Sequence, residues 1–434
     1  MTTCPTPLAE GAPLGLGVDL GTGGLRLALI EADGRVVAQL DSTYPAAFED
    51  PEGWRHGLIA LCSRLEPPLR ARIGAVALDG TSGTLLLCRP DGSPAPGALG
   101  QALPYHHACP EQAAAAASLV GPEAAATPAA GASGSLARAL ALLAAADRKG
   151  LRGPWLLRHQ ADWLMGWLLG DWRWGEEGNN LRLGWDLHTG SWSGSIGAQP
   201  WTPSLPRIRA SGSCLGTLAP PAAAALGLRV SCRVVAGSTD ASAAVLAADP
   251  RAGDGVTVLG TTLVLKQFSP VPIAGPGVSC QRLGGRWLVG GASNAGAGVL
   301  RRFFSDAQLL ELSRQIDPRR SSGLVLRPLP RPGERFPVDD PALEPLLEPR
   351  PVSDALYLQA LLEGLAAIER QGWRRLQALG APPVSRVLSL GGGARNPQWR
   401  ALRQRLLGVP VLNRPEATAA LGMARLAIRA ISAP

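Results

Sequence analysis

The same short pattern occurs twice in the chain: a strand, a turn that begins Gly-Thr, and a second strand. Its copies are Leu20-Gly21-Thr22 and, 239 residues further on, Leu259-Gly260-Thr261. A chain of 434 residues is long for one core, since domains average roughly 150 residues. The repeat therefore predicts a duplicated α/β architecture, with domains over 1–245 and 246–416.

The first copy predicts an antiparallel meander. Apolar residues alternate over 16–20 and again over 25–29, Asp33-Gly34 is a strong hairpin signal, and Val36-Val37 begins a third strand.

Asp19 ends the first of these strands, directly before the Gly-Thr-Gly-Gly turn at 21–24. Small turn residues let backbone N–H groups approach phosphate oxygens, and the Thr22 hydroxyl adds a donor. The carboxylate can hold Mg²⁺ or its water shell. A plain hairpin capped by Asp is an equal alternative. A strand follows the turn where a dinucleotide loop would open a helix, and the chain lacks the P-loop pattern, so both of those classes are excluded.

The second copy, Gly260-Thr261-Thr262, is a further phosphate candidate, although taken alone a turn without a ligand is favoured. Val258 stands where the first copy has Asp19. This asymmetry suits one metal serving a nucleotide held from both domains.

Asp240 follows a strand and opens a helix within Gly237-Ser238-Thr239-Asp240-Ala241. Taken alone, it is a helix N-cap. Its small neighbours leave room for a ligand, and it lies where the two domains are expected to meet. There a carboxylate can accept the proton of an attacking hydroxyl.

A glycine-rich stretch, Gly391-Gly392-Gly393-Ala394-Arg395-Asn396-Pro397, joins a strand to a helix. Asn396 is a natural N-cap and Pro397 a natural first helical residue. Three glycines exceed the need of a turn, so the backbone is expected to pack against something flat or charged. Trp399 either walls a base pocket or is a partly buried helix residue.

The remaining pattern is read more coarsely. A strand pair is expected at 73–78 and 85–87, and residues 111–135 are not placed. The alternation of strands and helices begins again near residue 234, with a strand expected at 234–236 and a helix at 242–248. Residues 326–352 are expected to form a surface loop. Helices are expected at 135–147, 156–169, 357–379, 397–407 and from about 417, and strands at 256–259, 263–265, 387–390 and 409–412.

The formal charge of +8 suggests nucleic acid, but the 42 basic residues are scattered and only Lys149 and Lys266 are lysines. No basic stripe carries the aromatic residues that single-strand binders use, so no nucleic-acid partner is expected. Seven dispersed cysteines predict reduced thiols in the cytoplasm. No apolar run reaches the ~18 residues of a membrane span, and no signal peptide is recognised.

In this order the four motifs, from Val18-Asp19-Leu20-Gly21-Thr22 to the glycine-rich stretch, resemble the FGGY family of carbohydrate kinases. The resemblance spans about 14–430 and is supported by Asp79–Thr84, His159–Trp163, Asn180–Asp186 and Gly290–Gly296. It implies a two-domain actin-like ATPase (ribonuclease-H-like) fold with the active site in the interdomain cleft. The last helix, 417–434, follows the second domain in sequence but can pack on the first domain.

The resemblance also implies a role for each matching residue. Asp240 is the general base, Asp19 positions Mg²⁺, and Asp240 is implied as a second metal-binding residue. The implied ATP contacts are Thr22, Gly23, Gly260, Thr261, Thr262, Gly392, Asn396 and Trp399. The implied sugar contacts are Ser82, Gly83, Asp240 and His107.

One segment departs from the family. Where the family has an aromatic residue followed by an Asp and an Arg, this chain has Tyr105-His106-His107-Ala108-Cys109-Pro110. The strings are most similar to a xylulose-kinase-like subgroup that prefers D-ribulose, so we expect ATP- and Mg²⁺-dependent phosphorylation of D-ribulose. D-xylulose, another pentulose or a polyol is the alternative, as is a non-catalytic nucleotide-binding sugar sensor. Monomer and homodimer fit equally.

Overall fold

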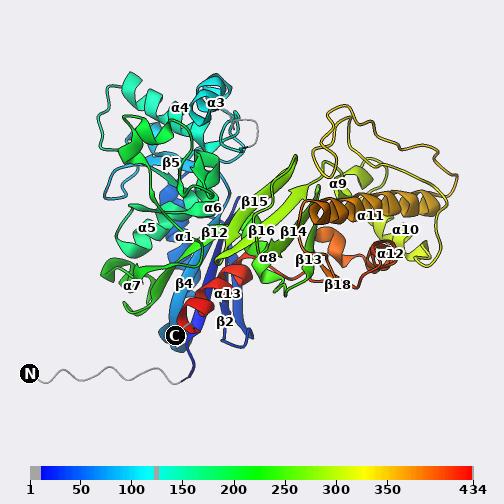
Figure 1. Ribbon diagram of the computed structural model, residues 1–434. Helices are drawn as coiled ribbons and strands as arrows, with labels where there is room; N and C mark the ends of the chain where they lie inside the picture. Colours follow the sequence, from blue (N-terminus) through cyan, green and yellow to red (C-terminus); the bar gives the residue numbers. More distant parts are fainter. Residues whose placement is uncertain (1–10, 122–126, 433–434) are drawn as a thin grey trace, which may run out of the picture. The chain divides into compact units, whose positions relative to one another are not determined.

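The computed structural model describes residues 11–121 and 127–432, which divide into two compact units (Figure 1). Unit 1 contains the chain up to Ala247, Arg282–Gly285 and the chain from Thr418 onward. Unit 2 contains Ala248–Gln281 and Arg286–Ala417. Each unit has its own six-stranded mixed sheet and its own hydrophobic core.

The large sheet of unit 1 has the strand order β11-β12-β4-β1-β2-β3. Its strands are β1 (Leu14–Gly21), β2 (Gly24–Ile30), β3 (Val36–Ser42), β4 (Ile73–Gly80), β11 (Cys214–Thr217) and β12 (Arg233–Thr239). The predicted antiparallel meander is confirmed as β1, β2 and β3. β4 and β12 continue the sheet parallel to β1, so the carboxyl ends of β1, β4 and β12 share one edge.

The last helix of the chain packs on the first strand. α13 (Ala419–Ser432) lies against β1 and against α8 (Asp240–Ala247), and Figure 1 shows it in red along the blue strands. Gly17 permits this approach, because a Cβ there would lie 1.9 Å from the carbonyl oxygen of Ala420. The other helices beside this sheet are α1 (Pro51–Ser63), α2 (Pro67–Arg72), α5 (Gln160–Leu169) and α7 (Pro220–Leu226).

The rest of unit 1 forms a satellite core around the strand pair β5 (Leu85–Cys88) and β6 (Leu156–His159). Two expectations are wrong here. β4 and β5 do not pair, because they belong to different sheets, and 156–159 is a strand because it pairs with β5, so only α5 remains of the helix expected at 156–169. The helix expected at 135–147 is confirmed as α4 (Ser135–Arg148). The further elements are α3 (Ala113–Val120), α6 (Glu177–Asn180), β7 (Trp174–Glu176), β8 (Trp185–Asp186), β9 (Ser191–Trp192) and β10 (Arg207–Arg209). Part of the unplaced stretch 111–135, namely 122–126, lies outside the described residues.

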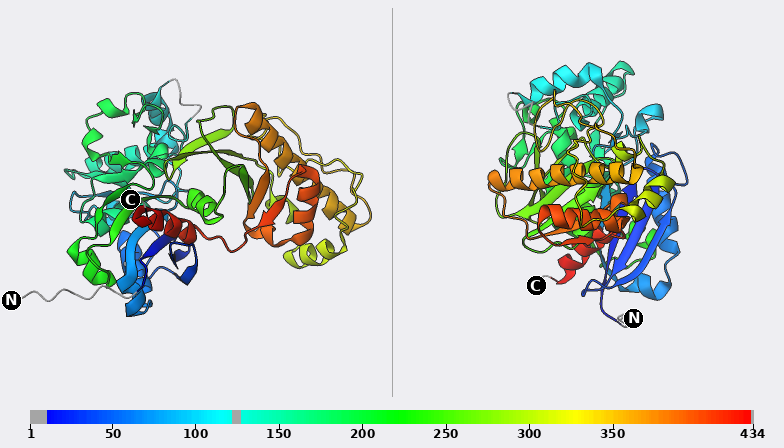
Figure 2. Two further views of the ribbon diagram at one scale, coloured as in Figure 1. Left: turned by 60° about the horizontal axis from the view of Figure 1, so that its bottom comes forward. Right: turned by 90° about the vertical axis from the view of Figure 1, so that its right-hand side faces the viewer.

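The sheet of unit 2 has the order β15-β16-β14-β13-β17-β18. Its strands are β13 (Asp254–Leu259), β14 (Leu263–Ser269), β15 (Val278–Leu283), β16 (Arg286–Ala292), β17 (Arg386–Leu390) and β18 (Val411–Asn413). Its helices are α9 (Ala297–Leu300), α10 (Asp306–Gln315), α11 (Asp354–Ala378) and α12 (Pro397–Leu407). α11 contacts β14 and packs beside α12, and Figure 2 shows both as orange ribbons next to the sheet.

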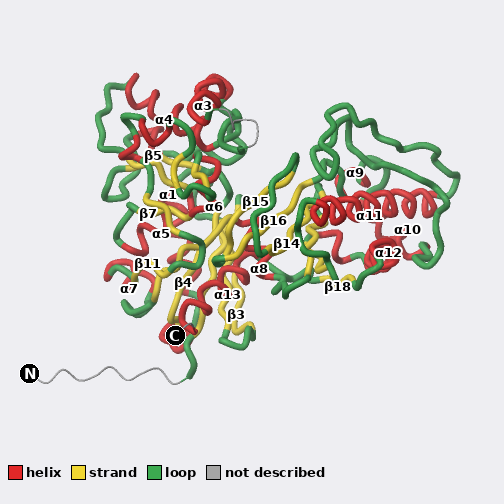
Figure 3. Tube along the Cα trace, viewed as in Figure 1, coloured by secondary structure: helices red, strands yellow, loops and turns green. Residues whose placement is uncertain are grey.

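A long connection between α10 and α11 contains no helix or strand, and Figure 3 shows it as a green loop. The expectation of a loop at 326–352 is confirmed, but the expectation that it is a surface loop is wrong in part. Leu329 and Phe336 are buried, and a Cβ at Gly291 would lie 2.3 Å from the Phe336 ring. An aromatic anchor thus fixes this connection on β16.

The two sheets repeat one arrangement, which confirms the predicted duplication. The order β3-β2-β1-β4-β12 in unit 1 corresponds to β16-β14-β13-β17-β18 in unit 2. In both, the second and third positions are antiparallel to each other and the last three strands are parallel. No helix within the described residues is both long enough and apolar enough to cross a membrane.

Candidate active site

Three aspartates gather at the carboxyl edge of the large sheet in unit 1. Asp19 of β1 and Asp79 of β4 are register partners, and Ser238 of β12 is the partner of Asp79 on its other side. Asp240 follows two residues later as the first residue of α8. The parallel pairing of β1, β4 and β12 therefore brings together carboxylates that are 60 and 161 residues apart in sequence.

Asp19 is buried and forms an ion pair across the hairpin. Its Oδ2 accepts a hydrogen bond from Arg26 Nη1 at 2.9 Å. Arg26 is the residue opposite Asp19 in the β1–β2 ladder. The sequence analysis did not single out Arg26, although counting outward from a two-residue turn pairs Asp19 with it. The first turn thus carries a cation beside its carboxylate.

Asp79 is fully buried, and neither carboxylate oxygen has a hydrogen-bond partner among the described residues. Burial, and next the charges of Asp19 and Asp240, raise its pKa well above the usual range. The nearby carboxyl group of Asp19 thus favours the protonated form of Asp79. The sequence analysis quoted Asp79 in a supporting motif but gave it no role.

Asp240 has its pKa raised to about 6, mainly by burial and further by the charge of Asp19. Its Oδ1 accepts a hydrogen bond from the N–H of Ala241 at 2.7 Å, and Arg182 lowers the pKa in opposition to burial. An N-cap carboxylate instead accepts from the amide two or three residues ahead. The geometry gives Asp240 the properties of a base that titrates near neutral pH.

Arg138 fastens the segment 105–107 beside Gly83. Its fully buried guanidinium donates to the carbonyl oxygens of Gly83 and His107, each at 2.9 Å, and also to that of Tyr105. The side chains of Tyr105, His106 and His107 are exposed. Ser82, Gly83 and His107, the expected sugar contacts, therefore belong to one local structure.

Arg182 also lies against Gly83; the sequence analysis quoted its segment, Asn180–Asp186, as a supporting motif but gave Arg182 no role. Its Nε donates to Ser82 Oγ at 3.2 Å, and its charge acts on Asp240. The contact with Ser82 joins residues 100 positions apart, and this contact gives Arg182 its place beside the site.

The first phosphate candidate is the turn Thr22-Gly23 between β1 and β2. Nothing among the described residues accepts a hydrogen bond from these two amides, and a Cβ on Gly23 would meet open space. The hydroxyl of Tyr44 donates to the Gly21 carbonyl oxygen at 2.8 Å and supports the turn from behind. The turn therefore presents backbone donors to an open face.

The second phosphate candidate is Gly260-Thr261-Thr262, between β13 and β14 in unit 2. Its carbonyl groups are occupied: Ala297 N–H donates to Gly260 at 2.9 Å and Gly298 N–H to Thr261 at 3.2 Å. Within the described chain, the amides of Thr261 and Thr262 have no acceptor. The two turns are alike in leaving backbone amides without acceptors.

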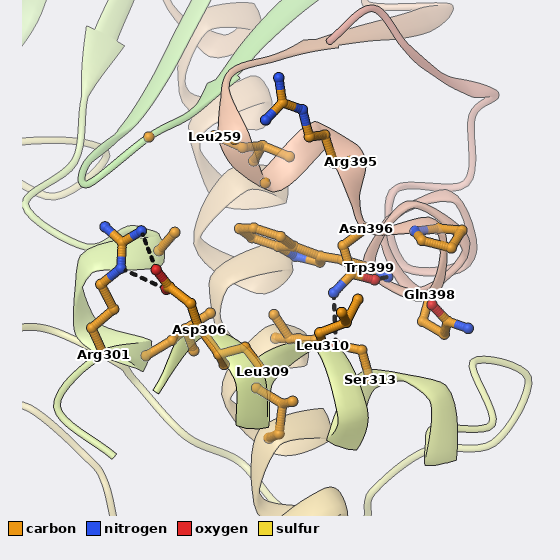
Figure 4. A pocket seen from close by; sticks show the side chains of 18 of the residues that line it. Leu259, Arg301, Asp306, Leu309, Leu310, Ser313, Arg395, Asn396, Gln398 and Trp399 are labelled. Carbon is orange, nitrogen blue, oxygen red and sulfur yellow. Dashed lines mark hydrogen bonds and ion pairs between the residues drawn. The ribbon is translucent and has the colours of Figure 1, made fainter. Parts of the chain in front are cut away.

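A cavity of about 650 Å³ opens beside this second turn, and Figure 4 shows it. The turn, α10 and the start of α12 line it, with Leu259, Leu309, Leu310 and Trp399 as apolar walls. The expected residues Gly260, Thr261, Gly392, Asn396 and Trp399 all line this cavity, whereas Thr262 does not.

Asn396 and Trp399 are held by the start of α12. Asn396 Oδ1 accepts from the N–H of Trp399 at 3.0 Å, which confirms the predicted cap, and its Nδ2 donates to Ser313 Oγ at 2.8 Å. The Trp399 indole is buried under Gly393, where a Cβ would come within 2.4 Å of the ring. Gly393 thus has no side chain because the indole occupies that space.

The sequence analysis missed α10, which forms one wall of the cavity. Its first turn carries a capping box between Ser305 and Gln308, a pattern that is readable in the sequence. Arg301 and Asp306 pair at 3.0 Å on the same side of the cavity (Figure 4).

Residues 255–431 match the C-terminal domain of the FGGY family of carbohydrate kinases. This part of the chain therefore matches the C-terminal domain of that family. The matched range contains the second turn, the glycine-rich stretch and the whole lining of the cavity. The resemblance stated from the motifs is confirmed, whereas the D-ribulose subgroup stays a prediction.

Solved structures of sugar and glycerol kinases extend the similarity of fold to nearly the whole chain. A "xyloylose kinase" from Brucella ovis is 22% identical, with a TM-score of 0.80 over 97% of this chain and 91% of that one. A xylulose kinase from Bifidobacterium adolescentis is 20% identical, with a TM-score of 0.78 over 97% and 93%. A Plasmodium falciparum glycerol kinase with ADP is 14% identical, with a TM-score of 0.76 over 97% and 90%. The expected actin-like fold is thereby confirmed.

The charged edge of unit 1 and the apolar cavity of unit 2 differ in the ligands that they can hold. The described residues contain no group of three or more His, Cys, Asp or Glu side chains arranged to hold a metal ion. Mg²⁺ in nucleotide sites keeps several waters and uses one or two carboxylates besides phosphates. Asp19, next to the unpartnered oxygens of Asp79, fits this mode.

Proposed function

We propose that the chain phosphorylates a ketopentose with ATP and that D-ribulose, giving D-ribulose 5-phosphate, is the preferred substrate. The observation that carries the reaction type is Asp240, a carboxylate with a pKa of about 6 at a strand edge. A general base is most effective when its pKa lies near the working pH. The choice of D-ribulose rests on the motif resemblance alone.

Asp240 removes the proton of the acceptor hydroxyl. The hydroxyl oxygen then forms a bond to the γ-phosphorus while the bond from that phosphorus to the bridging oxygen breaks, and ADP leaves with the electron pair. Phosphoryl transfer needs mostly alignment and charge neutralisation. The free amides of Thr22, Gly23, Thr261 and Thr262 supply donors for phosphate oxygens.

The cavity of unit 2 receives the nucleoside. The Trp399 indole and Leu310 offer apolar surface to a base, and Gly392 leaves open space beside them. Gly260 and Thr261 line the same cavity, and together with Thr262 they would bind the β- and γ-phosphates. The family resemblance implies that both phosphate turns contact the same ATP molecule.

Mg²⁺, when bound, neutralises phosphate charge and aligns the oxygens of the nucleotide. Asp19 would hold its water shell, and Asp240 would complete the carboxylate side. Arg26 limits Asp19 to one orientation through their 2.9 Å ion pair.

Ser82, Gly83 and His107 are proposed as sugar contacts on the acceptor side. The structural relatives include xylulose kinases, so D-xylulose is the second candidate substrate. We further propose a protein of the reducing cytoplasm, in which the six described cysteines, all free, remain thiols. It would act as a monomer or homodimer.

The test is ADP release with Mg-ATP over a panel of ketoses and polyols, with D-ribulose and D-xylulose as the central pair. The highest kcat/KM is expected with D-ribulose. A preference for D-xylulose would overturn the substrate and leave the reaction. No sugar-stimulated turnover, together with sugar and ATP binding by calorimetry, would favour a non-catalytic sensor.

A further inference from the structure

Arg182 is a half-buried cation that lacks the partners such a residue usually has. It lies in a short 3₁₀ helix, Leu181–Leu183, and burial lowers its pKa. Among the described residues, its one hydrogen bond runs from Nε to Ser82 Oγ at 3.2 Å, and it forms no ion pair. The two terminal nitrogens of its guanidinium therefore have no protein acceptor within the described part of the chain.

The fully buried arginines of the same protein are bonded much more completely. Arg138 and Arg158 donate to several backbone carbonyl groups. Arg403 donates twice to Glu369 and once to Ser389. A guanidinium taken from water without acceptors is costly. The fold satisfies this requirement at these three positions. Arg182 is only partly buried, and its two terminal nitrogens are left accessible to acceptors from a ligand.

The surroundings of Arg182 are those of the proposed acceptor site. A Cβ on Gly83 would lie 3.2 Å from Arg182 Cδ, so the absence of a side chain there leaves room for the arginine. Gly83 also has φ +104°, which favours glycine in any case. The charge of Arg182 reaches Asp240, the proposed base. All of these residues belong to unit 1.

We propose that Arg182 is a specificity-determining residue whose terminal N–H groups bind two adjacent oxygens of the acceptor sugar. This inference rests on the proposed function and names the part of it that selects the substrate. A planar guanidinium suits a pair of neighbouring oxygen acceptors. The preferred ligand is a neutral ketose in which a carbonyl oxygen, an acceptor only, stands beside a hydroxyl.

A polyol offers a weaker match. In a polyol the carbonyl is replaced by a hydroxyl, whose proton must be turned away before its oxygen can accept. Arg182 should therefore favour a ketose over the corresponding polyol. This preference distinguishes direct contact from a purely structural role of the arginine.

The experiment compares Arg182→Gln, Arg182→Lys and the control Arg152→Gln in the full chain. Arg152 is an exposed arginine of the same unit, so its replacement makes the same change of charge away from the site. Calorimetry without nucleotide measures the Kd of D-ribulose, D-xylulose and ribitol. Steady-state kinetics measures KM for sugar and for ATP, and thermal unfolding measures Tm.

Arg182→Gln should weaken ketose binding about 10- to 100-fold, because charged hydrogen bonds are lost. Ribitol binding should change less, and the KM for ATP and the Tm should stay near wild type. Arg182→Lys should recover part of the affinity, and Arg152→Gln should behave as wild type.

Unchanged ketose affinity in Arg182→Gln overturns this inference alone. The same conclusion follows if the KM for ATP rises while the sugar Kd is constant, because Arg182 then serves the nucleotide. A wild-type protein that binds a ketose without phosphorylating it overturns the proposed function alone. A wild-type protein that binds none of these sugars overturns both.

Discussion

The turn between β1 and β2 and the turn between β13 and β14 have the same place in duplicated sheets but different side chains. In the first, Asp19 faces Arg26 across the ladder; in the second, Val258 faces Val264. Both turns leave amides without acceptors. The duplicated element is therefore a turn whose free backbone amides are suited to bind anions, and the side chains around it differ between the two copies.

The regions around the two turns also differ in their side chains, which are charged in unit 1 and mainly apolar in unit 2. Asp19, Asp79 and Asp240 concentrate ionisable groups at the edge of unit 1, with Arg26 and Arg182 as cations. The cavity of unit 2 has walls of leucine and tryptophan. Unit 1 is thus suited to proton removal and to a polar acceptor, and unit 2 to a flat base.

The largest difference between an effect on turnover and an effect on ATP binding is expected for a substitution of Asp240. Asp240→Asn should lower kcat about 10²- to 10⁴-fold, because the amide cannot accept the hydroxyl proton. The Kd for ATP, which depends mainly on unit 2, should stay within about twofold by calorimetry. Asp147→Asn is the control, since Asp147 is an exposed carboxylate of the same unit. Turnover within a few-fold of wild type would remove Asp240 from the base role.

The two copies of the turn can be compared directly by mutating Asp19 and Val258. Asp19→Asn should lower turnover and raise the Mg²⁺ concentration for half-maximal rate, by about 10- to 100-fold, because a group that orients the metal's waters is lost. Val258→Thr, at the matching position in unit 2, should leave the Mg²⁺ requirement unchanged. An Mg²⁺ titration of initial rates measures both. Equal effects at the two positions would mean that the turns share the metal equally.

How far sequence alone reaches differs between these regions. The strand–turn–strand pattern, Asn396 as a helix cap and the repeated architecture follow from local patterns, and the structure confirms them. β6 was expected to be helical because its apolar run is compatible with either structure, and pairing with β5 decides it. Local periodicity cannot supply such a partner.

The missed site residues have a similar cause. Asp79 gains its place from parallel pairing with β1, and Arg182 from a contact with Ser82. Both relations join distant segments of the chain. Arg26 and α10 are different, because hairpin register and the capping box at Ser305 are local signals that could have been used.

The pH dependence of kcat/KM for sugar, compared with that of ATP binding, distinguishes the two units without a mutation. Since Asp240 has its pKa raised to about 6 and acts when deprotonated, kcat/KM for sugar should fall below pH 6, to about one tenth at pH 5. The charge of Asp19 favours the protonated form of Asp240, and the charge of Arg182 favours its ionised form. ATP binding should change less over this range. An acid limb that persists in the residual activity of Asp240→Asn would assign it to another group.

The smallest effect is expected on the nucleotide side, at Leu310. This side chain lines the cavity of unit 2 yet is 62% exposed, so it can be changed with little cost to folding. Leu310→Asn should raise the Kd for ATP about 3- to 10-fold through lost apolar contact, with an unchanged Kd for sugar. Val352→Asn, at a fully exposed position outside the cavity, is the matched control. If Leu310→Asn weakened sugar binding instead, the assignment of base recognition to unit 2 and of sugar recognition to unit 1 would be reversed.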